Sequence, residues 1–352
     1  PGWRDVMRAC EPLVRLMESL EKDLEKLLTL IEALPENSRG ESYRTLPGVI
    51  KQGQEIRGQI SSFVLSPDEE FIYWSSLSQG EATLCAAPLS VRSTLQSRLF
   101  SEKSSVVVTS ATLRSGEDFS YIENRLGLSE ADKISIPSPF DYSGSCLVTV
   151  AEDMPEPDKN NYYEALEAAL KEICRATKGR TLVLFTAHNM LRSLRYRLQP
   201  VLDKEGTLLL AQGVDGSAKH LLTQFRSQEN TILFGTSSFW EGVDVVGEAL
   251  SVLVIVKLPF PVPSDPIIAA RSEAYEDAFR EYSLPLAILK FKQGFGRLIR
   301  SQSDRGVLVV LDSRLKNKYY GKSFLEALPL CAKKFTPVRQ IPKEIKSWLG
   351  WS

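Results

Sequence analysis

The second half of the chain alternates short apolar runs with amphipathic stretches, and this alternation limits the fold more than any other feature. We expect strands at Leu147–Ala151, Thr181–Phe185, Thr207–Ala211, Thr231–Phe234, Val252–Lys257 and Val307–Leu311. We expect helices at Tyr162–Ala176, Asn189–Val201, Ala218–Ser227, Ile267–Tyr282 and Pro285–Ile299. Such alternation is typical of a parallel, doubly wound α/β sheet. Ligands of these sheets bind at the carboxyl ends of the strands, so residues that follow a strand are the first candidates for function.

The beginning of the chain has a different pattern. Apolar residues recur over Val6–Leu34 in alternating steps of four and three, which predicts a long helix that Pro35–Gly40 ends. Pro12 either kinks this helix or marks its first turn. A weaker periodic run, Leu46–Phe63, predicts a second helix packed against the first. We expect a helical hairpin inserted into a larger domain, with a freestanding coiled coil as the alternative.

The region between these two parts predicts strands and one helix. Phe71–Trp74 and Thr83–Pro88 are expected to be strands, separated by a turn at Ser75–Glu81. Val91–Phe100 is expected to be a helix. Ser105–Thr109 is expected to be a short buried strand.

Composition limits the class of protein. The 352 residues are 43% hydrophobic and 25% charged, which is enough for two domains with a proper core. Lys and Arg number 43 against 44 Asp and Glu, so any nucleic-acid binding must use a local basic patch. No window reaches the roughly 18 apolar residues of a membrane span, and no signal peptide is visible. We therefore expect a cytoplasmic protein without a membrane partner; because residue 1 is Pro, we also expect a piece of a longer polypeptide.

Cysteine and histidine usage argues against a metal site. The five cysteines are odd in number, scattered and without a C-x-x-C pair, so we expect buried, reduced thiols. His188 is expected to be a cap or loop residue and His220 to be solvated. With two histidines far from any cysteine cluster, we expect no zinc or other metal in this chain.

The stretch Gln293–Arg300, QGFGRLIR, precedes the last predicted strand. If Leu286–Ser301 is helical, Gln293, Arg297 and Arg300 fall at i, i+4 and i+7 and line one face. Two guanidiniums one turn apart suit the spread charge of a phosphate group better than two ammoniums would. The alternative is a surface helix held by salt bridges.

Two glycines interrupt the same stretch. Gly294 and Gly296 each cost a helix about 1 kcal/mol relative to Ala. We therefore expect some other group to come close to this backbone.

Polar segments follow three of the predicted strands: Thr109–Leu113, Thr186–His188 and Gly235–Asp244. Nucleic-acid phosphates are commonly bound by hydroxyls and helix N-termini, so Thr186 is a candidate for such a contact. The helix after it carries Arg192, Arg195 and Arg197, which either touch nucleic acid or form a solvated face.

The same segments stand in the order and spacing of helicase motifs III to VI: Thr109–Leu113, Leu184–Thr186, Phe239–Asp244 with Lys257–Phe260, and Gln293–Arg300. Together they resemble the DinG/XPD branch of superfamily 2 DNA helicases, nearer to bacterial DinG. Ser138–Tyr142 and Tyr320–Pro329 are also similar to DinG-type chains, so the resemblance covers roughly Leu84 to Pro329. Trp-Glu-Gly-Val-Asp followed by Gln-x-x-Gly-Arg-x-x-Arg is a specific pairing, whereas Ser-Ala-Thr is common to many helicases.

The resemblance implies a domain organisation and an activity. Residues 141–352 would form a RecA-like second motor domain with motifs IV to VI. Residues 67–140 would be the tail of the first motor domain with motif III, and residues 1–66 would belong to a helical arch. The implied activity is ATP-dependent translocation on single-stranded DNA, 5′→3′, with Mg²⁺ bound to the ATP.

The resemblance also implies residue roles. Arg297 and Arg300 would be arginine fingers on the γ-phosphate. The ATP-side residues would be Gln293, Gly294, Glu241, Gly242 and Asp244. The DNA-side residues would be Thr186, Ser237, Ser238 and Trp240. Thr109, Ser110 and Thr112 would couple the two motor domains. From the residues alone, Trp240 also fits a protein core, Asp244 a cap, and the three hydroxyls a plain capped turn.

Some family features are missing from the chain. There is no Gly-x-x-x-x-Gly-Lys-Ser/Thr loop after a strand and no strand-end carboxylate for Mg²⁺. Gly321–Ser323 does not qualify, because Lys316 stands where the first glycine is needed. The cysteines of the family's iron–sulfur cluster are also missing, so a cluster is possible only in the longer parent.

We therefore expect this chain to act with the N-terminal motor domain of the same parent. Alone it should bind DNA weakly and hydrolyse little or no ATP. Two alternatives stay open: the nucleic-acid platform of a DinG-type nuclease, and a non-catalytic DNA-binding module.

Overall fold

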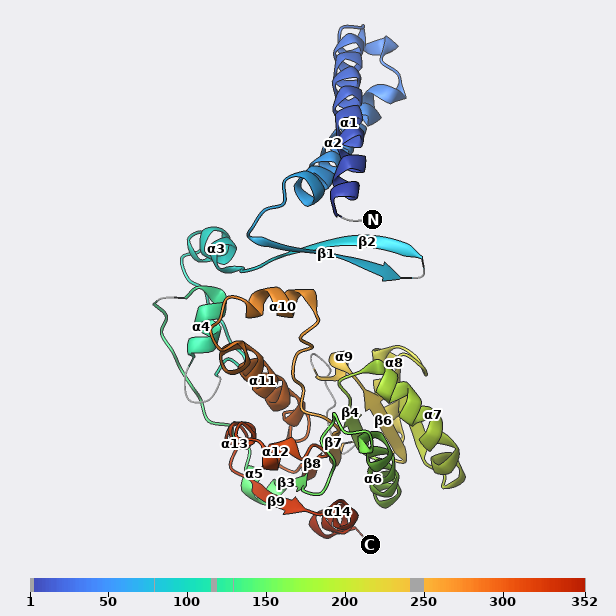
Figure 1. Cartoon of the computed structure of the whole chain (residues 1–352), viewed down its shortest axis with the longest axis vertical. Coiled ribbons are helices and arrows are strands. Elements are labelled where there is room, and N and C mark those ends of the chain that lie inside the picture. Colours follow the sequence, from blue (N-terminus) through green and yellow to red (C-terminus); the bar gives the residue numbers. More distant parts are fainter. Residues whose placement is uncertain (1–2, 79, 115–118, 129, 241–249, 352) are drawn as a thin grey trace. The chain divides into compact units, whose positions relative to one another are not determined.

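The computed structural model describes residues 3–78, 80–114, 119–128, 130–240 and 250–351. The chain forms two compact units, Pro1–Ser93 with Pro263–Glu273, and Thr94–Val262 with Ala274–Ser352. Figure 1 labels most of the helices and strands of both units.

The larger unit is built on a sheet of seven strands among the described residues, and every neighbouring pair is parallel. The strands are β3 (Cys146–Ala151), β4 (Thr181–Leu184), β5 (Leu208–Ala211), β6 (Thr231–Gly235), β7 (Val252–Ile255), β8 (Gly306–Val310) and β9 (Ala332–Thr336). They lie in the order β5-β6-β4-β7-β8-β3-β9. The six predicted strands and the parallel α/β class are confirmed.

The sequence pattern does not predict the edge strand β9. Ala332–Thr336 has no apolar run, because Lys333 and Lys334 stand in its middle and are exposed. In the part of the chain that is described, β9 pairs only with β3. Charged side chains on an edge strand protect it from pairing with another molecule.

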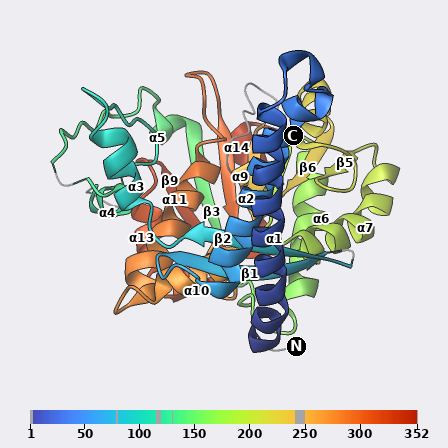
Figure 2. The same ribbon diagram turned by 90° about the horizontal axis from the view of Figure 1, so that it is seen from above.

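Helices cover both faces of this sheet (Figures 1 and 2). Successive strand residues alternate between two apolar clusters, so that Val148 lies in one and Leu147 in the other. The first cluster includes α8 (Ala218–Ser227), α11 (Leu284–Phe295) and α13 (Gly321–Glu326). The second includes α6 (Tyr162–Thr177), α7 (His188–Lys204) and α14 (Ile341–Leu349). Helices on both faces of a parallel sheet are the doubly wound arrangement that the alternation predicts.

Short elements complete the described chain. They are α3 (Arg92–Leu95), α4 (Ser120–Leu126), α5 (Tyr142–Ser145), α9 (Ser237–Trp240), α12 (Arg314–Asn317), the π-helical turns η3 (Gln96–Phe100) and η4 (Phe279–Ser283), and the 3₁₀ turn η5 (Val338–Gln340). The predicted helix Ile267–Tyr282 is wrong in its middle, because α10 (Pro266–Ser272) ends before η4 begins. The carboxylate of Asp277 accepts the backbone N–H of Arg280 (3.0 Å), so Asp277 caps a new turn.

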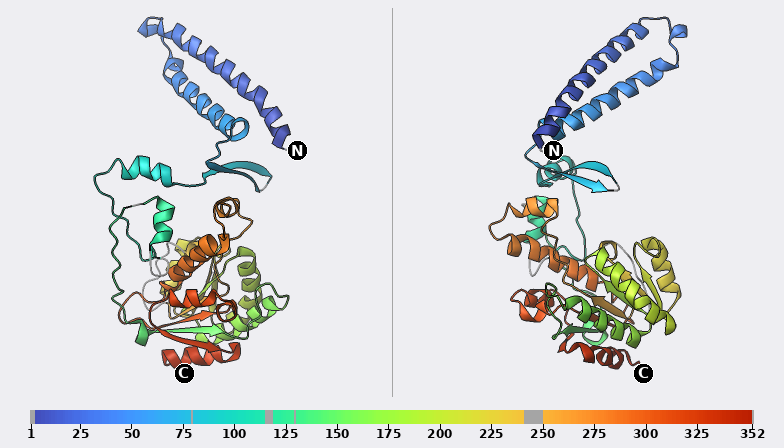
Figure 3. Two further views of the ribbon diagram at one scale, coloured as in Figure 1. Left: turned by 60° about the vertical axis from the view of Figure 1, so that its left-hand side comes forward. Right: turned by 45° about the vertical axis from the view of Figure 1, so that its right-hand side comes forward.

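The smaller unit begins with the predicted helical hairpin (Figure 3). It consists of α1 (Trp3–Glu32), the 3₁₀ turn η1 (Glu36–Ser38), α2 (Glu41–Ile60) and the π-helical turn η2 (Ser61–Leu65). Arg57 of α2 reaches Glu21 (3.0 Å) and Glu18 (3.3 Å) of α1. Pro12 lies inside α1, so it does not mark the first turn.

An antiparallel pair of strands follows the helical hairpin. β1 (Phe71–Ser78) and β2 (Glu81–Pro88) pair along their whole length, from Phe71 with Pro88 to Ser78 with Glu81. The predicted turn Ser75–Glu81 is therefore too long, because backbone pairing continues through residues that are not apolar. Arg271 of α10 donates to the carbonyl oxygen of Leu89 (3.1 Å) in the same unit.

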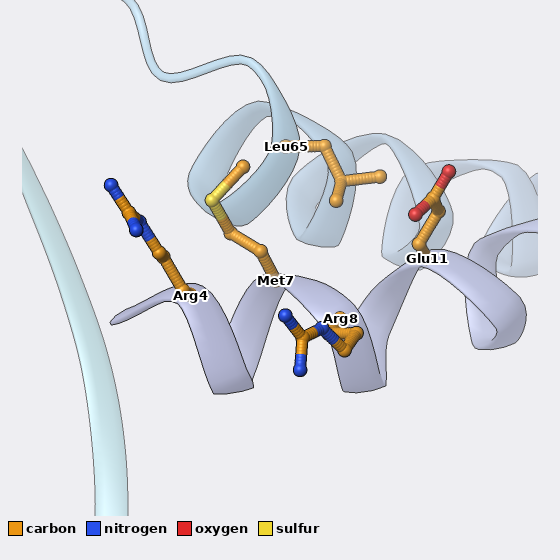
Figure 4. A pocket seen from close by; sticks show the side chains of 5 residues that line it. All are labelled: Arg4, Met7, Arg8, Glu11 and Leu65. Carbon is orange, nitrogen blue, oxygen red and sulfur yellow. The ribbon is translucent and has the colours of Figure 1, made fainter. Parts of the chain in front are cut away.

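A shallow hollow of about 460 Å³ lies in the helical hairpin, at the first turns of α1 (Figure 4). Met7 and Leu65 supply its apolar lining, and Arg4, Arg8 and Glu11 are its charged residues. Glu11 also pairs with Arg15 (2.7 Å), a typical i, i+4 ion pair of a helix surface.

The predicted buried strand Ser105–Thr109 is wrong. This segment has no regular structure, and Val106, Val107 and Val108 are 37%, 87% and 44% exposed. No strand within the described ranges pairs with it. A single strand without neighbours can neither satisfy its backbone hydrogen bonds nor bury its valines, so the pattern alone could not produce the element.

Candidate functional site

The arginines of the Gln293–Arg300 stretch lie in a turn after α11. The helix ends at Phe295, and the N–H of Arg297 donates to the carbonyl oxygen of Gly294 (3.1 Å). The predicted helix is therefore confirmed as far as Phe295, but its continuation to Ile299 or Ser301 is wrong, and with it the shared helical face of Gln293, Arg297 and Arg300.

Core packing explains the apolar spacing of this turn. Leu298 and Ile299 are 2% and 3% exposed. Leu298 packs on Gly306 at the start of β8, where an added Cβ would lie 2.5 Å from the leucine Cγ. Arg297 and Arg300 flank this buried pair, which anchors the backbone at both guanidinium-bearing residues.

Asp304 fixes the backbone of Arg300. Its carboxylate accepts the backbone N–H groups of Arg300 (2.8 Å) and Ser301 (2.9 Å), and the hydroxyl of Ser301 (2.7 Å). Burial raises the pKa of Asp304, but these hydrogen bonds and the charge of Arg300 outweigh it and leave the pKa below its usual value. The carboxylate therefore holds this turn in its ionised form at neutral pH.

The two guanidiniums are partly desolvated. Burial lowers the pKa of Arg297, and burial followed by the nearby charge of Arg226 lowers that of Arg300, against the opposing effect of Asp304. Arg297 donates to the carbonyl oxygen of Trp240 (3.2 Å). Both guanidiniums remain charged at neutral pH, because the ordinary pKa of arginine lies far above neutrality. A group of partly buried positive charges favours an anionic ligand with several oxygens.

Trp240 belongs to the core. Its side chain is 1% exposed, and its indole N–H donates to the carbonyl oxygen of Phe185 (2.9 Å). The prediction that Trp240 faces DNA is therefore wrong, and the alternative of a core aromatic holds. The ring lies on Gly294, where an added Cβ would come within 3.0 Å of Cζ3. The group expected to approach the glycine backbone is this ring; Gly296 has no comparably close neighbour.

The segment Thr109–Leu113 meets the end of α11. The side-chain amide of Gln293 donates to the hydroxyl of Thr112 (3.3 Å), which lies 3.3 Å from the hydroxyl of Ser110. One predicted coupling residue, Thr112, therefore touches a predicted ATP-side residue, and Ser110 contacts Thr112. Thr109 lies at the exposed start of this segment.

The carboxyl ends of β4, β5 and β6 share a hydrogen-bond network. The hydroxyl of Thr236 lies 3.0 Å from Nε2 of His188 and donates to Oε1 of Gln212 (3.0 Å). The same oxygen accepts the backbone N–H of Thr236 (2.8 Å), and the amide nitrogen of Gln212 donates to the hydroxyl of Ser238 (2.7 Å). Thr236 is buried, while His188, Ser238 and the nearby Thr186 are exposed. These exposed polar groups can meet a ligand at the sheet edge.

Neither Gln212 nor Thr236 was among the residues predicted from the sequence. Each directly follows a strand, β5 and β6 respectively, which is the signal that selected Thr186 after β4. Their contact depends on the register of β5 beside β6, in which Ala211 stands opposite Phe234.

Other predicted residues are placed only in part. Glu241, Gly242 and Asp244 lie outside the described residues, and Ser237 is described only as the first residue of α9. In the basic face of α7, Arg195 pairs with Asp215 (Nε to Oδ2, 3.1 Å) and Arg197 pairs with Glu167 (3.0 Å). Arg192 is exposed.

Two features are absent from the described part of the chain. It contains no group of three His, Cys, Asp or Glu residues arranged to hold a metal ion. None of its helices has the length and apolar character needed to cross a membrane. Cys146 and Cys174 are buried, whereas Cys10, Cys85 and Cys331 are partly exposed, so the prediction of uniformly buried thiols is wrong.

The sequence of the chain is similar to those of known proteins. Residues 170–331 match the family described as helicase C-terminal domain. The chain is 40% identical over 263 residues to the ATP-dependent DNA helicase YoaA of Escherichia coli (strain K12), covering 74% of this chain and 41% of the relative. It is 34% identical over 338 residues to the 3′-5′ exonuclease DinG of Bacillus subtilis (strain 168), covering 92% of this chain and 36% of the relative. The chain thus spans less than half the length of these two relatives.

The fold also has a counterpart among solved structures. An apo structure of XPD has a TM-score of 0.57 with this chain, at 18% identity, over 84% of this chain and 63% of that chain. At this identity the likeness concerns the fold, and it confirms the predicted RecA-like sheet.

Proposed function

Because this chain belongs to the DinG/XPD-like helicases as a C-terminal region that contains a helicase C-terminal domain, we propose that it is part of an ATP-dependent DNA helicase. Within that helicase, this chain contributes arginine fingers to the ATP site and part of the surface that binds single-stranded DNA. The observation that carries the proposal is the pair Arg297 and Arg300, partly desolvated and anchored on either side of a buried segment.

The ATP side follows from the charge of this turn. During transfer, negative charge spreads over the oxygens of the γ-phosphate, and an arginine finger that stabilises it contributes about 10³–10⁵ in rate. The carbonyl oxygen of Trp240 accepts a hydrogen bond from Arg297, and the carboxylate of Asp304 holds the backbone of Arg300. Both arginines are therefore positioned before ATP binds. Guanidiniums fit phosphate rather than Mg²⁺, so Mg²⁺ and the P-loop would come from the partner motor domain. Gln293 and Gly294, with Glu241, Gly242 and Asp244, would border the same nucleotide.

The partner is the N-terminal motor domain of the same parent protein. Support comes from Val106, Val107 and Val108, which form a strand-like apolar run that is exposed in this chain. Such a run can add a strand to the sheet of another domain. In this organisation residues 1–66 are part of a helical arch, 67–140 are the tail of the first motor domain, and 141–352 are the second. The contact between Gln293 and Thr112 would couple the two domains.

The DNA side lies at the carboxyl ends of β4 and β6. Thr186 and Ser238 are exposed there, and we assign Ser237, the neighbour of Ser238 in the chain, to the same DNA side. The helix α7, which is 17 residues long, begins next to Thr186, and its N-cap Ala187 provides no side-chain cap. The first N–H groups of such a helix are available to a phosphate. We assign 5′→3′ movement along the strand to the complete motor.

A second candidate is favoured by the relative from Bacillus subtilis, whose name is 3′-5′ exonuclease DinG. In that case the same surfaces would hold single-stranded DNA for a nuclease domain elsewhere in the parent. The chain would then still bind DNA, but substitution of Arg297 or Arg300 would leave ATP turnover unchanged.

The DNA side is tested with the present chain by fluorescence anisotropy of a labelled 20-nucleotide oligo-dT at several salt concentrations. We expect weak binding that falls as salt rises, and a loss of about threefold to tenfold in Thr186→Val, as for one hydrogen bond to a phosphate. Thr223→Val is the matched control, because its exposed hydroxyl bonds only within α8, to the carbonyl of Lys219 (3.1 Å). Equal affinities of both variants and wild type would contradict the assignment of Thr186.

A further inference from the structure

Gln212 joins the loops that follow two neighbouring strands. Its backbone N–H continues the β5–β6 ladder to the carbonyl oxygen of Phe234 (3.0 Å). From that fixed position its side chain reaches across to Thr236 and Ser238, the residues with which the chain leaves β6. The side chain therefore spans the start of the segment that the proposed function places beside DNA.

The orientation of the Gln212 amide is determined by its partners. A backbone N–H can only donate, so the atom 2.8 Å from the N–H of Thr236 must be the amide oxygen. The hydroxyl of Thr236 donates to the same oxygen (3.0 Å). The NH₂ group is thereby directed at the hydroxyl of Ser238 (2.7 Å).

This orientation determines what Ser238 can offer a ligand. Its oxygen accepts a hydrogen bond from Gln212, so its own proton is left to donate in another direction. Ser238 is exposed, and a DNA phosphate accepts hydrogen bonds but cannot donate them. We propose that Gln212 is a positioning residue for DNA binding, which commits the hydroxyl of Ser238 to donate to a backbone phosphate. This inference rests on the proposed DNA side.

The test uses the whole chain, the labelled 20-nucleotide oligo-dT at low salt, and a double-mutant cycle. Gln212→Glu keeps an oxygen for the N–H and the hydroxyl of Thr236. Its second oxygen cannot donate, so it accepts a hydrogen bond from the hydroxyl of Ser238. The proton of that hydroxyl then points away from the DNA. We expect Gln212→Glu and Ser238→Ala each to weaken binding about tenfold, as for one hydrogen bond to a charged group.

The double variant separates positioning from direct contact. If Gln212 acts through Ser238, Gln212→Glu in the Ser238→Ala background lowers affinity by no more than about threefold, the part due to its added charge. A full additional tenfold loss would mean that Gln212 contacts DNA itself, and would overturn the inference. The same holds if Gln212→Glu leaves the affinity of the chain unchanged.

Two controls keep these outcomes distinct. Urea unfolding of each variant verifies the fold, and Gln212→Glu should stay close to wild type because Thr236 keeps its partner. If wild type itself shows no salt-dependent binding of the oligonucleotide, the DNA side of the proposed function fails and this inference fails with it. If wild type binds and the cycle is additive, only the role of Gln212 fails.

Discussion

The indole of Trp240 lies on the backbone of Gly294, so close that a Cβ at position 294 would stand 3.0 Å from Cζ3 and 3.1 Å from Cε3. The carbonyl oxygen of the same tryptophan accepts a hydrogen bond from Arg297. One residue thus connects the segment after β6 to the helix and turn that carry the arginines. If this segment moves when DNA binds, the hydrogen bond from Arg297 to Trp240 would transmit the movement directly to Arg297.

The first prediction concerns this contact. Gly294→Ala should lower the free energy of unfolding by about 1–3 kcal/mol, because the methyl group forces the buried ring to shift. Gly296→Ala is the matched control: its Cβ would meet no atom closer than 3.4 Å, so the variant should be neutral or about 0.5–1 kcal/mol more stable. Urea unfolding of both variants measures the difference. Equal stabilities would show that the ring and the glycine do not pack as described.

The second prediction concerns the Asp304 turn. The pKa of Asp304 is lowered in the folded chain, so its charge stabilises the fold above the unfolded pKa of about 3.9 and this contribution is lost as pH falls through the folded pKa. Asp304→Asn keeps an oxygen acceptor but removes the charge. It should cost no more than about 1 kcal/mol at pH 7, because the carboxylate is partly exposed to water.

Unfolding measured at several pH values checks this dependence. The difference between wild type and Asp304→Asn should shrink below about pH 4 as the wild-type carboxyl is protonated. Asp158→Asn serves as the control, since this exposed carboxylate makes a long contact of 3.8 Å with Lys159 and acts on Lys318 through its charge. A difference that does not change with pH would mean that the charge of Asp304 is not what holds the turn.

The third prediction concerns the exposed valines. Val107 is 87% exposed, so Val107→Lys should change the stability of this chain by no more than about 0.5 kcal/mol. In a polypeptide that also contains the N-terminal motor domain, the same substitution should destabilise by several times as much, because it would place a charge in a packed sheet. Thermal unfolding of both forms makes the comparison. Equal small effects in both would contradict the proposed pairing of this strand with the partner domain.

The sequence allowed the sheet to be predicted because β3, β4 and β6 to β8 are completely buried and therefore mostly apolar, with Thr149, Thr181 and Thr231 as buried polar residues. It did not reveal β9, whose Lys333 and Lys334 suit an edge, or the end of α11, beyond which Leu298 and Ile299 are buried for tertiary reasons. Local pattern cannot distinguish burial in a helix from burial in a turn.

The site was predictable to a similar degree. The helical cost of Gly294 indicated that another group approaches its backbone, but only the fold identifies that group as Trp240. Gln212 carries no motif of its own, and its contacts with Thr236 and Ser238 exist because β5 and β6 are neighbours in register. Residue types suggested the chemistry, whereas partners distant in sequence required the topology.

The central claim is that Arg297 and Arg300 act on ATP. Its most direct test is the rate of ATP hydrolysis, with and without single-stranded DNA, by a polypeptide that carries this chain together with the Walker A motor domain. Arg297→Ala and Arg300→Ala should each lower DNA-stimulated turnover at least about a hundredfold. Arg305→Ala, at an exposed arginine that stacks on Trp348 (5.6 Å), should stay within about twofold of wild type. The account would be contradicted if Arg297→Ala or Arg300→Ala folded normally and left turnover unchanged. That result would favour a platform that only holds DNA.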